Sequence, residues 1–269
     1  MTSMGIFAIN LDRSPDRWKL ITAGFSALPW PLHRVRAIDG RDVAATLAFR
    51  GHTVSMAPDG VGWSYPRLRM VSVAEEACFC SHLAALRQFL DTDFTHALIL
   101  EDDARILTPI DACVRGLLDM VDGPQIVKLS GSHQVGKRLA LRVGTVGRQN
   151  LVRSFQPASN SAAYMVTRES AERIIATAGL TLATFDDFLS APSLHGCEML
   201  HVSPWVISNK GSGSKSTLTG SRNRHRRNTL RGPRSWALQA WRRTGLRLGV
   251  WRDAARGLRN SRFMLARWA

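Results

Sequence analysis

The pattern of apolar and polar positions predicts alternating strands and helices from the first residues onward. Residues 4–11 form an apolar run that suits a buried strand, and Ser14-Pro15 then supplies an N-cap and a proline at the first helical position. Apolar side chains share one helical face from Trp18 to Leu28, and residues 32–38 are typical of a second strand. A strand-helix-strand opening predicts a mainly parallel sheet.

The same alternation continues to about residue 207. A capping box, Ser72-x-x-Glu75, opens a helix whose apolar stripe ends near Leu90. The other expected elements are strands over 96–101, 126–129, 162–166 and 199–207, helices starting at Thr108-Pro109 and capped by Thr167, and a hairpin or mobile loop over 130–152. This order predicts one α/β domain over residues 1–207.

The composition changes after residue 207. Residues 208–234 are rich in Gly, Ser and Arg and are typical of a linker, and residues 235–269 form an Arg/Trp-rich tail, either helical or disordered. The net charge is +15, yet residues 222–269 alone hold 14 Arg, no Lys and one acid, Asp253. A nearly neutral body therefore carries a strongly basic tail. Such a tail suits an anionic membrane surface or a nucleic acid as its partner. The third alternative is a disordered tail that only keeps the protein in solution.

Bulk features exclude several classes of protein. No run approaches the about eighteen apolar residues of a spanning helix, and the start of the chain is typical of a strand, so a cytoplasmic protein is expected. The four cysteines lack the paired clusters of a structural zinc site. Buried, reduced thiols are expected at Cys78, Cys80, Cys113 and Cys197.

The most informative segment is an apolar run that ends in three carboxylates, Glu101-Asp102-Asp103. Like charges at the end of a strand repel one another, and a divalent cation offsets that repulsion. Carboxylates that hold a cation at the carboxyl end of a strand are a common way to bind a diphosphate in α/β proteins. The alternative is an acidic turn that caps the next element.

Further motifs accompany the triplet in a recognisable order from residue 5 to about residue 207. They are Ile9-Asn10-Leu11-Asp12-Arg13 with Arg17, Ala37-Ile38-Asp39-Gly40, Glu75, Cys78, Ser81-His82-Leu83, Leu98 to Asp103, Ile126 to Leu129, Ala163-Tyr164 and Asp186-Asp187. In this order the chain resembles glycosyltransferase family 25 of bacterial lipopolysaccharide synthesis. The family has Gly-Glu-Ile-Gly-Cys where this chain has Ala74-Glu75-Glu76-Ala77-Cys78.

The resemblance implies a fold and an activity. The fold is a GT-A-like, Rossmann-type mixed sheet flanked by helices. The activity is inverting transfer of a hexose, commonly galactose from UDP-galactose, to a lipooligosaccharide or related glycan, with Mn²⁺ or Mg²⁺ as cofactor. Because such acceptors are often linked to lipid, the resemblance favours an anionic membrane surface over nucleic acid as the partner of residues 222–269.

The triplet is the expected metal site. Positions i and i+2 of an extended segment share a side, so Glu101 and Asp103 both face the nucleotide. We expect Asp103 to be a direct ligand, and Glu101 to ligate through water or to contact the ribose. Asp102 suits either role.

Donor contacts are expected at the end of the first strand. Asn10 is a candidate for the base, Arg13 or Arg17 for phosphate, and Asp12 lies with them. A turn and a solvated helix face explain the same residues without a ligand.

Three more positions take roles from the resemblance. Asp39-Gly40 is typical of a turn, and the resemblance implies that it contacts the ribose. The resemblance also implies that His82 contacts the donor sugar or diphosphate, although a helical histidine is often simply packed. Glu75 is explained by its capping box.

The acceptor hydroxyl needs a base on the face opposite the leaving group. Asp187 is the expected base and Asp186 the alternative, while a helix N-cap explains both without catalysis. Two other functions suit the sequence less well. A metal-dependent nucleotide-sugar hydrolase would use the same carboxylates, and a nucleic-acid-binding protein would leave the triplet without a purpose.

Overall fold

The structure is a computed structural model of the whole chain. It describes residues 2–42, 44–46, 62–63, 70–131, 136–137, 140–154, 160–178, 183–209 and 267–268. The expected linker and Arg/Trp-rich tail lie outside these residues, apart from the short pieces at 208–209 and 267–268. Within the described ranges, no helix has both the length and the apolar character needed to cross a membrane.

An eight-stranded sheet forms the centre of the molecule, in the order β2-β1-β5-β11-β7-β12-β10-β9. Its strands are β1 (Met4–Asn10), β2 (Leu32–Arg36), β5 (His96–Glu101), β7 (Gln125–Lys128), β9 (Ala140–Val146), β10 (Gln149–Ser154), β11 (Ala163–Thr167) and β12 (Glu198–Ser203). Three two-stranded ladders pair β3 (Gly62–Trp63) with β4 (Met70–Val71), β6 (Arg105–Ile106) with β13 (Ile207–Ser208), and β8 (Gly136–Lys137) with β14 (Arg267–Trp268).

The sheet is mixed, so the expectation of a mainly parallel sheet is wrong. β1 pairs in parallel with β2 and β5, and β7 pairs in parallel with β12. β11 runs antiparallel between β5 and β7, and the hairpin β9–β10 joins β12 antiparallel. Because β11 reverses between them, β5 and β7 still end at the same edge. The carboxyl ends of six strands, β1, β2, β5, β7, β9 and β12, therefore lie at this edge.

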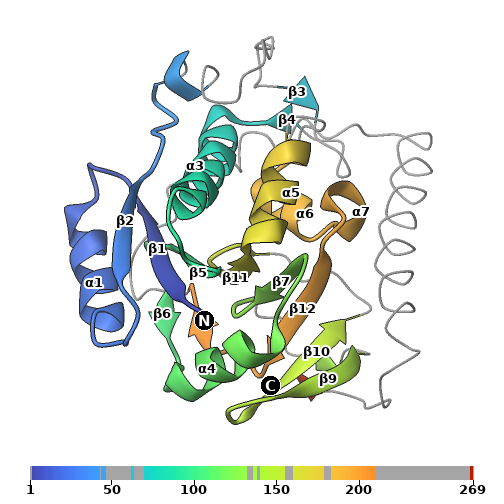
Figure 1. Cartoon of the computed structure of the whole chain (residues 1–269). Coiled ribbons are helices and arrows are strands. Elements are labelled where there is room, and N and C mark those ends of the chain that lie inside the picture. Colours follow the sequence, from blue (N-terminus) through green and yellow to red (C-terminus); the bar gives the residue numbers. More distant parts are fainter. Residues whose placement is uncertain are drawn as a thin grey trace.

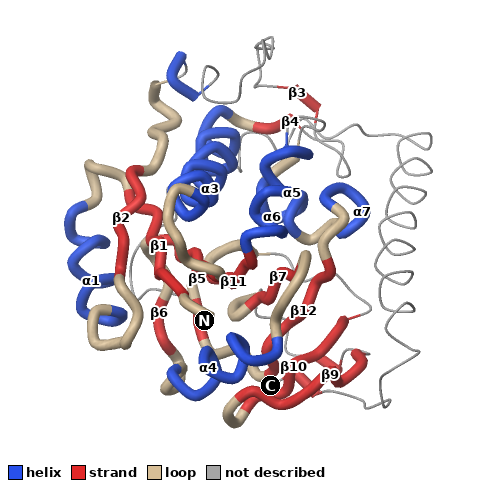
Figure 2. Tube along the Cα trace, in the orientation of Figure 1, coloured by secondary structure: helices blue, strands red, loops and turns tan. Residues whose placement is uncertain are grey.

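Helices cover both faces of the sheet (Figures 1 and 2). They are α1 (Pro15–Phe25), α3 (Val73–Leu90), α4 (Asp111–Met120), α5 (Arg168–Ala178), α6 (Phe185–Leu189) and α7 (Pro192–His195). Alternate residues of β1 separate the layers: Ile6 packs with the cluster of α1 and α4, whereas Phe7 packs with the cluster of α3, α5 and α6. The expected mixed α/β sheet flanked by helices is confirmed.

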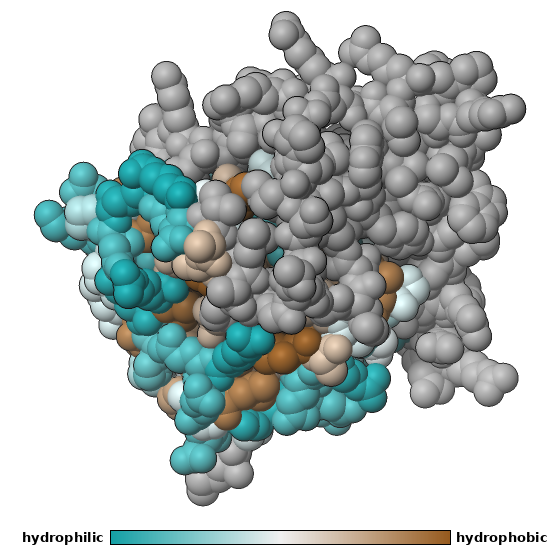
Figure 3. Space-filling view, turned by 90° about the horizontal axis from the view of Figure 1, so that it is seen from above, coloured by the Kyte–Doolittle hydropathy of each residue, from teal (hydrophilic) through white to brown (hydrophobic). Residues whose placement is uncertain are grey.

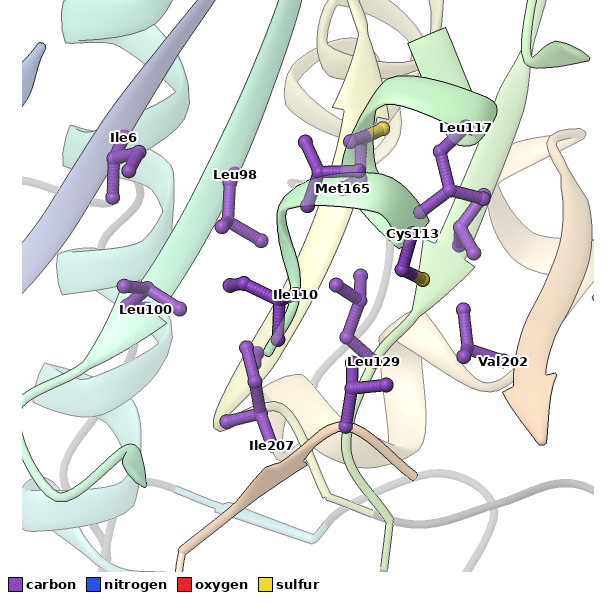
Figure 4. Packing of buried hydrophobic residues seen from close by; sticks show 14 of the residues in the cluster. Ile6, Leu98, Leu100, Ile110, Cys113, Leu117, Leu129, Met165, Val202 and Ile207 are labelled. Atoms are coloured by element: carbon purple, nitrogen blue, oxygen red, sulfur yellow. The ribbon is translucent and has the colours of Figure 1, made fainter. Parts of the chain in front are cut away.

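The core beside α4 shows how this layer is filled. Side chains of β1, β5 and β11, including Ile6, Leu98 and Met165, lie against Cys113 and Leu117 of α4 (Figure 4). All five are at most 1% exposed. Seen from above, the described surface is mainly hydrophilic, with hydrophobic residues showing only in places (Figure 3).

Local signals are confirmed better than element boundaries. The capping box forms, because the Ser72 hydroxyl accepts from the Glu75 N–H while the Glu75 carboxylate accepts from the Ser72 N–H. The helix expected from Thr108-Pro109 begins only at Asp111, with Ile110 before it and no side-chain cap. Residues 130–152 contain most of a hairpin, and the strand expected over 199–207 is split between β12 and β13.

Candidate active site

A cavity of about 440 Å³ lies beyond the carboxyl ends of β1, β2 and β5. One wall is α3, through Ala74, Ala77, Cys78, Ser81 and His82, and the segments after β1 and β2 also line the cavity. Glu101, Asp102 and Asp103 line the same cavity, so the structure brings the acidic triplet to a cleft. An open sheet binds ligands at this edge in many α/β proteins.

The three carboxylates of the triplet have different surroundings. Glu101 accepts a hydrogen bond from Ser161 Oγ at 2.7 Å, and its Oε1 lies 3.4 Å from His82 Nε2. Asp102 is held from the other side, by Asn10 Nδ2 and Arg17 Nη1, each at 2.8 Å. Its charge is thus balanced within the protein.

Asp103 differs from both neighbours. Its Oδ1 is buried and has no hydrogen-bond partner among the described residues. Burial first, and then the charges of Glu101 and Asp102, raise the pKa of Asp103 to about 7. A buried carboxylate oxygen without a partner, beside two further carboxylates, is an all-oxygen donor set that suits Mn²⁺ or Mg²⁺.

Asn10 and Asp12 are not among the residues that line the cavity. Asn10 is fully buried: its Nδ2 donates to Ser14 O and to Asp102, and its Oδ1 accepts from Arg34 at 2.8 and 3.1 Å. Asp12 pairs with Arg34 and Arg36 at the surface. Asn10 is therefore held by Ser14, Asp102 and Arg34 in this structure, and its contact with a base stays a prediction.

The loop after β2 does reach the cavity, as expected for Asp39 and Gly40. Arg13 Nε donates to Asp39 Oδ2 at 2.7 Å, and this bond lowers the pKa of Asp39. A Cβ on Gly40 would lie 2.8 Å from Ala74 Cα, so only glycine allows this approach to α3. The loop thus lies against the helix even though Ala74 replaces a family glycine.

His82 lies at the centre of a buried chain of polar groups. Its Nδ1 is 3.1 Å from the Tyr164 hydroxyl, and its ring stacks on Phe185 with centroids 4.0 Å apart. Burial alone would raise the pKa of Glu101, but the hydrogen bond and charge of His82 and the bond from Ser161 bring it below the usual value. His82 is therefore both packed and part of the cavity wall.

The carboxylates of α6 lie near a buried lysine at the end of β7. Lys128 Nζ donates to Ser190 Oγ at 2.7 Å. Burial lowers the pKa of Lys128 to about 8, although the charges of Asp186 and Asp187 raise it. The charge of Asp186 also acts on Glu101, whereas Asp187 is 8% exposed. Neither aspartate is among the residues that line the cavity.

Sequence reasoning gave no site role to Ser161, Tyr164 or Lys128. All three lie where a strand begins or ends at the same edge of the sheet, and Tyr164 is in register with Lys128. The only signal was the presence of Tyr164 and Lys128 in the family motifs. Their contacts depend on β11 lying between β5 and β7.

The cysteines are free thiols, as expected. Cys80, Cys113 and Cys197 are buried, but Cys78 is only half-buried and lines the cavity. One ligand atom each from Cys78, His82 and Glu101 lies within 4.8 Å of the others.

A protein-family model matches most of the chain. The family profile described as Glycosyltransferase family 25 (LPS biosynthesis protein) matches residues 4–189. No curated protein matches the chain.

Two solved structures overlap most of the chain at low identity. The galactosyltransferase LgtC, in complex with donor and acceptor sugar analogues, is 12% identical and covers 88% of this chain and 100% of its own, with a TM-score of 0.37. Mouse xyloside xylosyltransferase 1, apo form, is 10% identical and covers 80% of this chain and 100% of its own, with a TM-score of 0.44.

Proposed function

The chain belongs to glycosyltransferase family 25, and on this premise we propose that it transfers a hexose from a UDP-linked donor, UDP-galactose in the first instance, to a lipooligosaccharide or related glycan with inversion at the anomeric carbon. The observation that carries the proposal is the buried Asp103 oxygen without a partner, in a cavity that also contains Arg13 and Arg17.

Asp103 is the proposed direct ligand of Mn²⁺ or Mg²⁺, and Glu101 is proposed to ligate through a water molecule or to contact the ribose. A divalent cation bound there would stabilise the negative charge that develops on the leaving diphosphate. Arg13 and Arg17 add positive charge to the cavity lining, where they suit phosphate oxygens. Asp39 and Gly40 are the proposed ribose contacts, and Asp102 positions Arg17.

Inversion requires a carboxylate that accepts the acceptor hydroxyl proton while the new glycosidic bond forms and the bond to the diphosphate breaks. We assign this role to Asp186, because its charge acts on Glu101 and it is more exposed than Asp187. Asp186 Oδ1 accepts from Thr184 Oγ1 at 2.6 Å, which orients the carboxylate. The charges of both Asp186 and Asp187 raise the pKa of the buried Lys128.

The test is calorimetric titration of a panel of nucleotide sugars, with and without Mn²⁺. We expect a UDP-sugar to bind only with metal, and Asp103→Ala to abolish that binding. Metal-independent binding, or no binding to any nucleotide sugar, contradicts the proposal. A second assay separates transfer from hydrolysis: sugar release from the donor without any acceptor, at the rate seen with acceptor, favours a hydrolase.

The proposed membrane partner rests on residues 222–269, which lie outside the described residues apart from 267–268. Each arginine near an anionic bilayer contributes about 1 kcal/mol, and tryptophan favours the interface. Deleting these residues should abolish sedimentation with anionic vesicles. Unchanged sedimentation of the shortened protein refutes the membrane contact. If the deletion abolishes binding to an RNA but leaves vesicle binding unchanged, the segment is assigned to nucleic acid.

A further inference from the structure

The cavity wall formed by α3 holds a second donor set, distinct in chemistry from Asp103. Cys78 and His82 are four residues apart on α3, so their side chains share one helix face. Glu101 meets them from the end of β5, and the three ligand atoms lie within 4.8 Å of one another. We propose that Cys78, His82 and Glu101 bind a borderline-soft divalent cation of the Zn²⁺ class, with an open coordination position toward the cavity.

The distances suit a tetrahedral ion. Zinc bonds of 2.0–2.3 Å place neighbouring ligands roughly 3.3–3.8 Å apart. His82 Nε2 and Glu101 Oε1 are already 3.4 Å apart. Cys78 and Glu101 are both half-buried, so small side-chain rotations close the remaining gap, while the stacked His82 ring stays in place.

The groups behind the three ligands support the same assignment. When Nε2 of a histidine binds a metal, Nδ1 carries the proton and needs an acceptor. Tyr164 Oη, 3.1 Å from His82 Nδ1, is that acceptor, and Ser161 Oγ orients the Glu101 carboxylate. A protein that only packed His82 against Phe185 would not need a half-buried thiol and a carboxylate at its other nitrogen.

Charge and softness distinguish this site from the one at Asp103. A thiolate, a carboxylate and a neutral imidazole together balance a divalent cation. Thiolate selects Zn²⁺ or Co²⁺ over Mg²⁺ or Mn²⁺, which prefer oxygen ligands. All three residues line the cavity, so the ion keeps a position for water or a ligand oxygen. Glu101 is common to this site and to the proposed Mn²⁺ or Mg²⁺ site, whereas Cys78 and His82 belong to this site alone.

The experiment uses Co²⁺ as a spectroscopic probe for the full-length, metal-free protein. We expect thiolate-to-cobalt charge-transfer absorption that one equivalent of Zn²⁺ displaces. Cys78→Ser should remove it, and Cys197→Ser, a buried cysteine that donates to Ser170 O, should retain it. Absence of the absorption in the wild-type protein, or its persistence in Cys78→Ser, overturns the proposal.

Further measurements keep the test valid if Cys78→Ser does not fold, and they separate the two metal sites. In the wild-type protein, Zn²⁺ should protect Cys78 from alkylation, as followed by mass spectrometry, and equal alkylation with and without Zn²⁺ contradicts the site. Tyr164→Phe should weaken Zn²⁺ binding about 10–100-fold by removing the acceptor for His82 Nδ1. Asp103→Asn should keep the cobalt absorption even if it loses Mn²⁺-dependent donor binding, so either proposal can fail alone.

Discussion

Asn10 Nδ2 donates a hydrogen bond to Asp102 Oδ2 at 2.8 Å, across 92 residues of sequence. Arg17 balances the charge of this middle carboxylate, and both partners reach it from the side of β1 and α1. All three acids line the cavity: Asp102 with its charge balanced, Glu101 toward α3, and Asp103 with a buried oxygen that has no partner among the described residues. Three adjacent acids therefore divide into one whose charge the protein balances and two that we propose for the metal site.

The first prediction concerns this division. Asp102→Asn should lower the free energy of unfolding by about 1–3 kcal/mol, because it removes a charged partner of Arg17. Asp103→Asn should leave the melting temperature equal or higher without metal, since it removes a buried repulsive charge. Mn²⁺ should raise the melting temperature of the wild-type protein but not of Asp103→Asn. Denaturant unfolding and thermal melts measure both effects, and a large destabilisation by Asp103→Asn argues against a metal-facing role.

The second prediction tests the close approach of Gly40 to α3. Gly40→Ala should weaken binding of the UDP-sugar, because the new Cβ would meet backbone atoms of Ala74 and push the Asp39 loop out of place. Gly24→Ala in α1 is the matched control: it has nothing within 4 Å, and it should stabilise the protein by about 0.5–1 kcal/mol without changing donor affinity. Calorimetry of both variants decides, and unchanged affinity in Gly40→Ala would remove this loop from the donor site.

The third prediction separates the two aspartates of α6. Asp186→Asn should reduce kcat by about 10²–10⁴-fold, the usual contribution of a positioned base, with donor affinity nearly unchanged. Asp187→Asn should have a smaller effect on kcat, because the Asp187 side chain is buried. Steady-state rates with saturating donor, combined with donor titrations, test the assignment. The opposite order of the two kcat losses would give the role of base back to Asp187.

The fourth prediction is a pH dependence of stability. His195 Nδ1 accepts from the Cys197 N–H, so Nε2 carries the proton that faces Leu189 O. Burial lowers the pKa of His195 from 6.5 to about 4, so the unfolded chain binds the additional proton first as the pH falls. The contribution of His195 to the free energy of unfolding is fully present above pH 6.5. It is lost as the pH falls toward 4, and the total loss is about 3 kcal/mol.

Denaturant unfolding from pH 7 to pH 4 measures that loss. His195→Asn lacks the titrating group, so its stability should fall less steeply over the same interval. His96, whose pKa burial also lowers, is present in both proteins and cancels in the difference. Parallel curves for the two proteins would show that the His195 ring already accommodates a proton in the folded state.

The sequence predicted those features of the fold that depend only on residues close together in the chain. The capping box at Ser72, the proline at the start of α1 and the carboxylates after β5 depend on neighbours in sequence, and the structure has all three. The direction of β11 depends on which strands it joins. Its apolar residues are buried whichever way it runs, so no pattern within 163–167 distinguishes the two directions.

The candidate site follows the same division. The placement of Asp103, Asp39 and His82 at a cavity was expected from strand ends and family motifs. The hydrogen bonds from Arg34 to Asn10 were not expected. The two residues belong to adjacent parallel strands, and their contact depends on the register of β1 against β2. The half-buried thiol of Cys78 was missed for a similar reason: burial of a helix position is decided by the element that covers it.

The reversal of β11 has an evolutionary consequence. Its beginning, and not its end, adjoins the acidic edge, so Ser161 reaches Glu101 directly from the segment that enters the strand. Insertions or exchanges in that entering segment would alter the surroundings of Glu101 without moving the strand ends beside it. Sequence change just ahead of Ala163 is therefore a route by which a chain of this fold can vary one side of its cavity while the sheet stays the same.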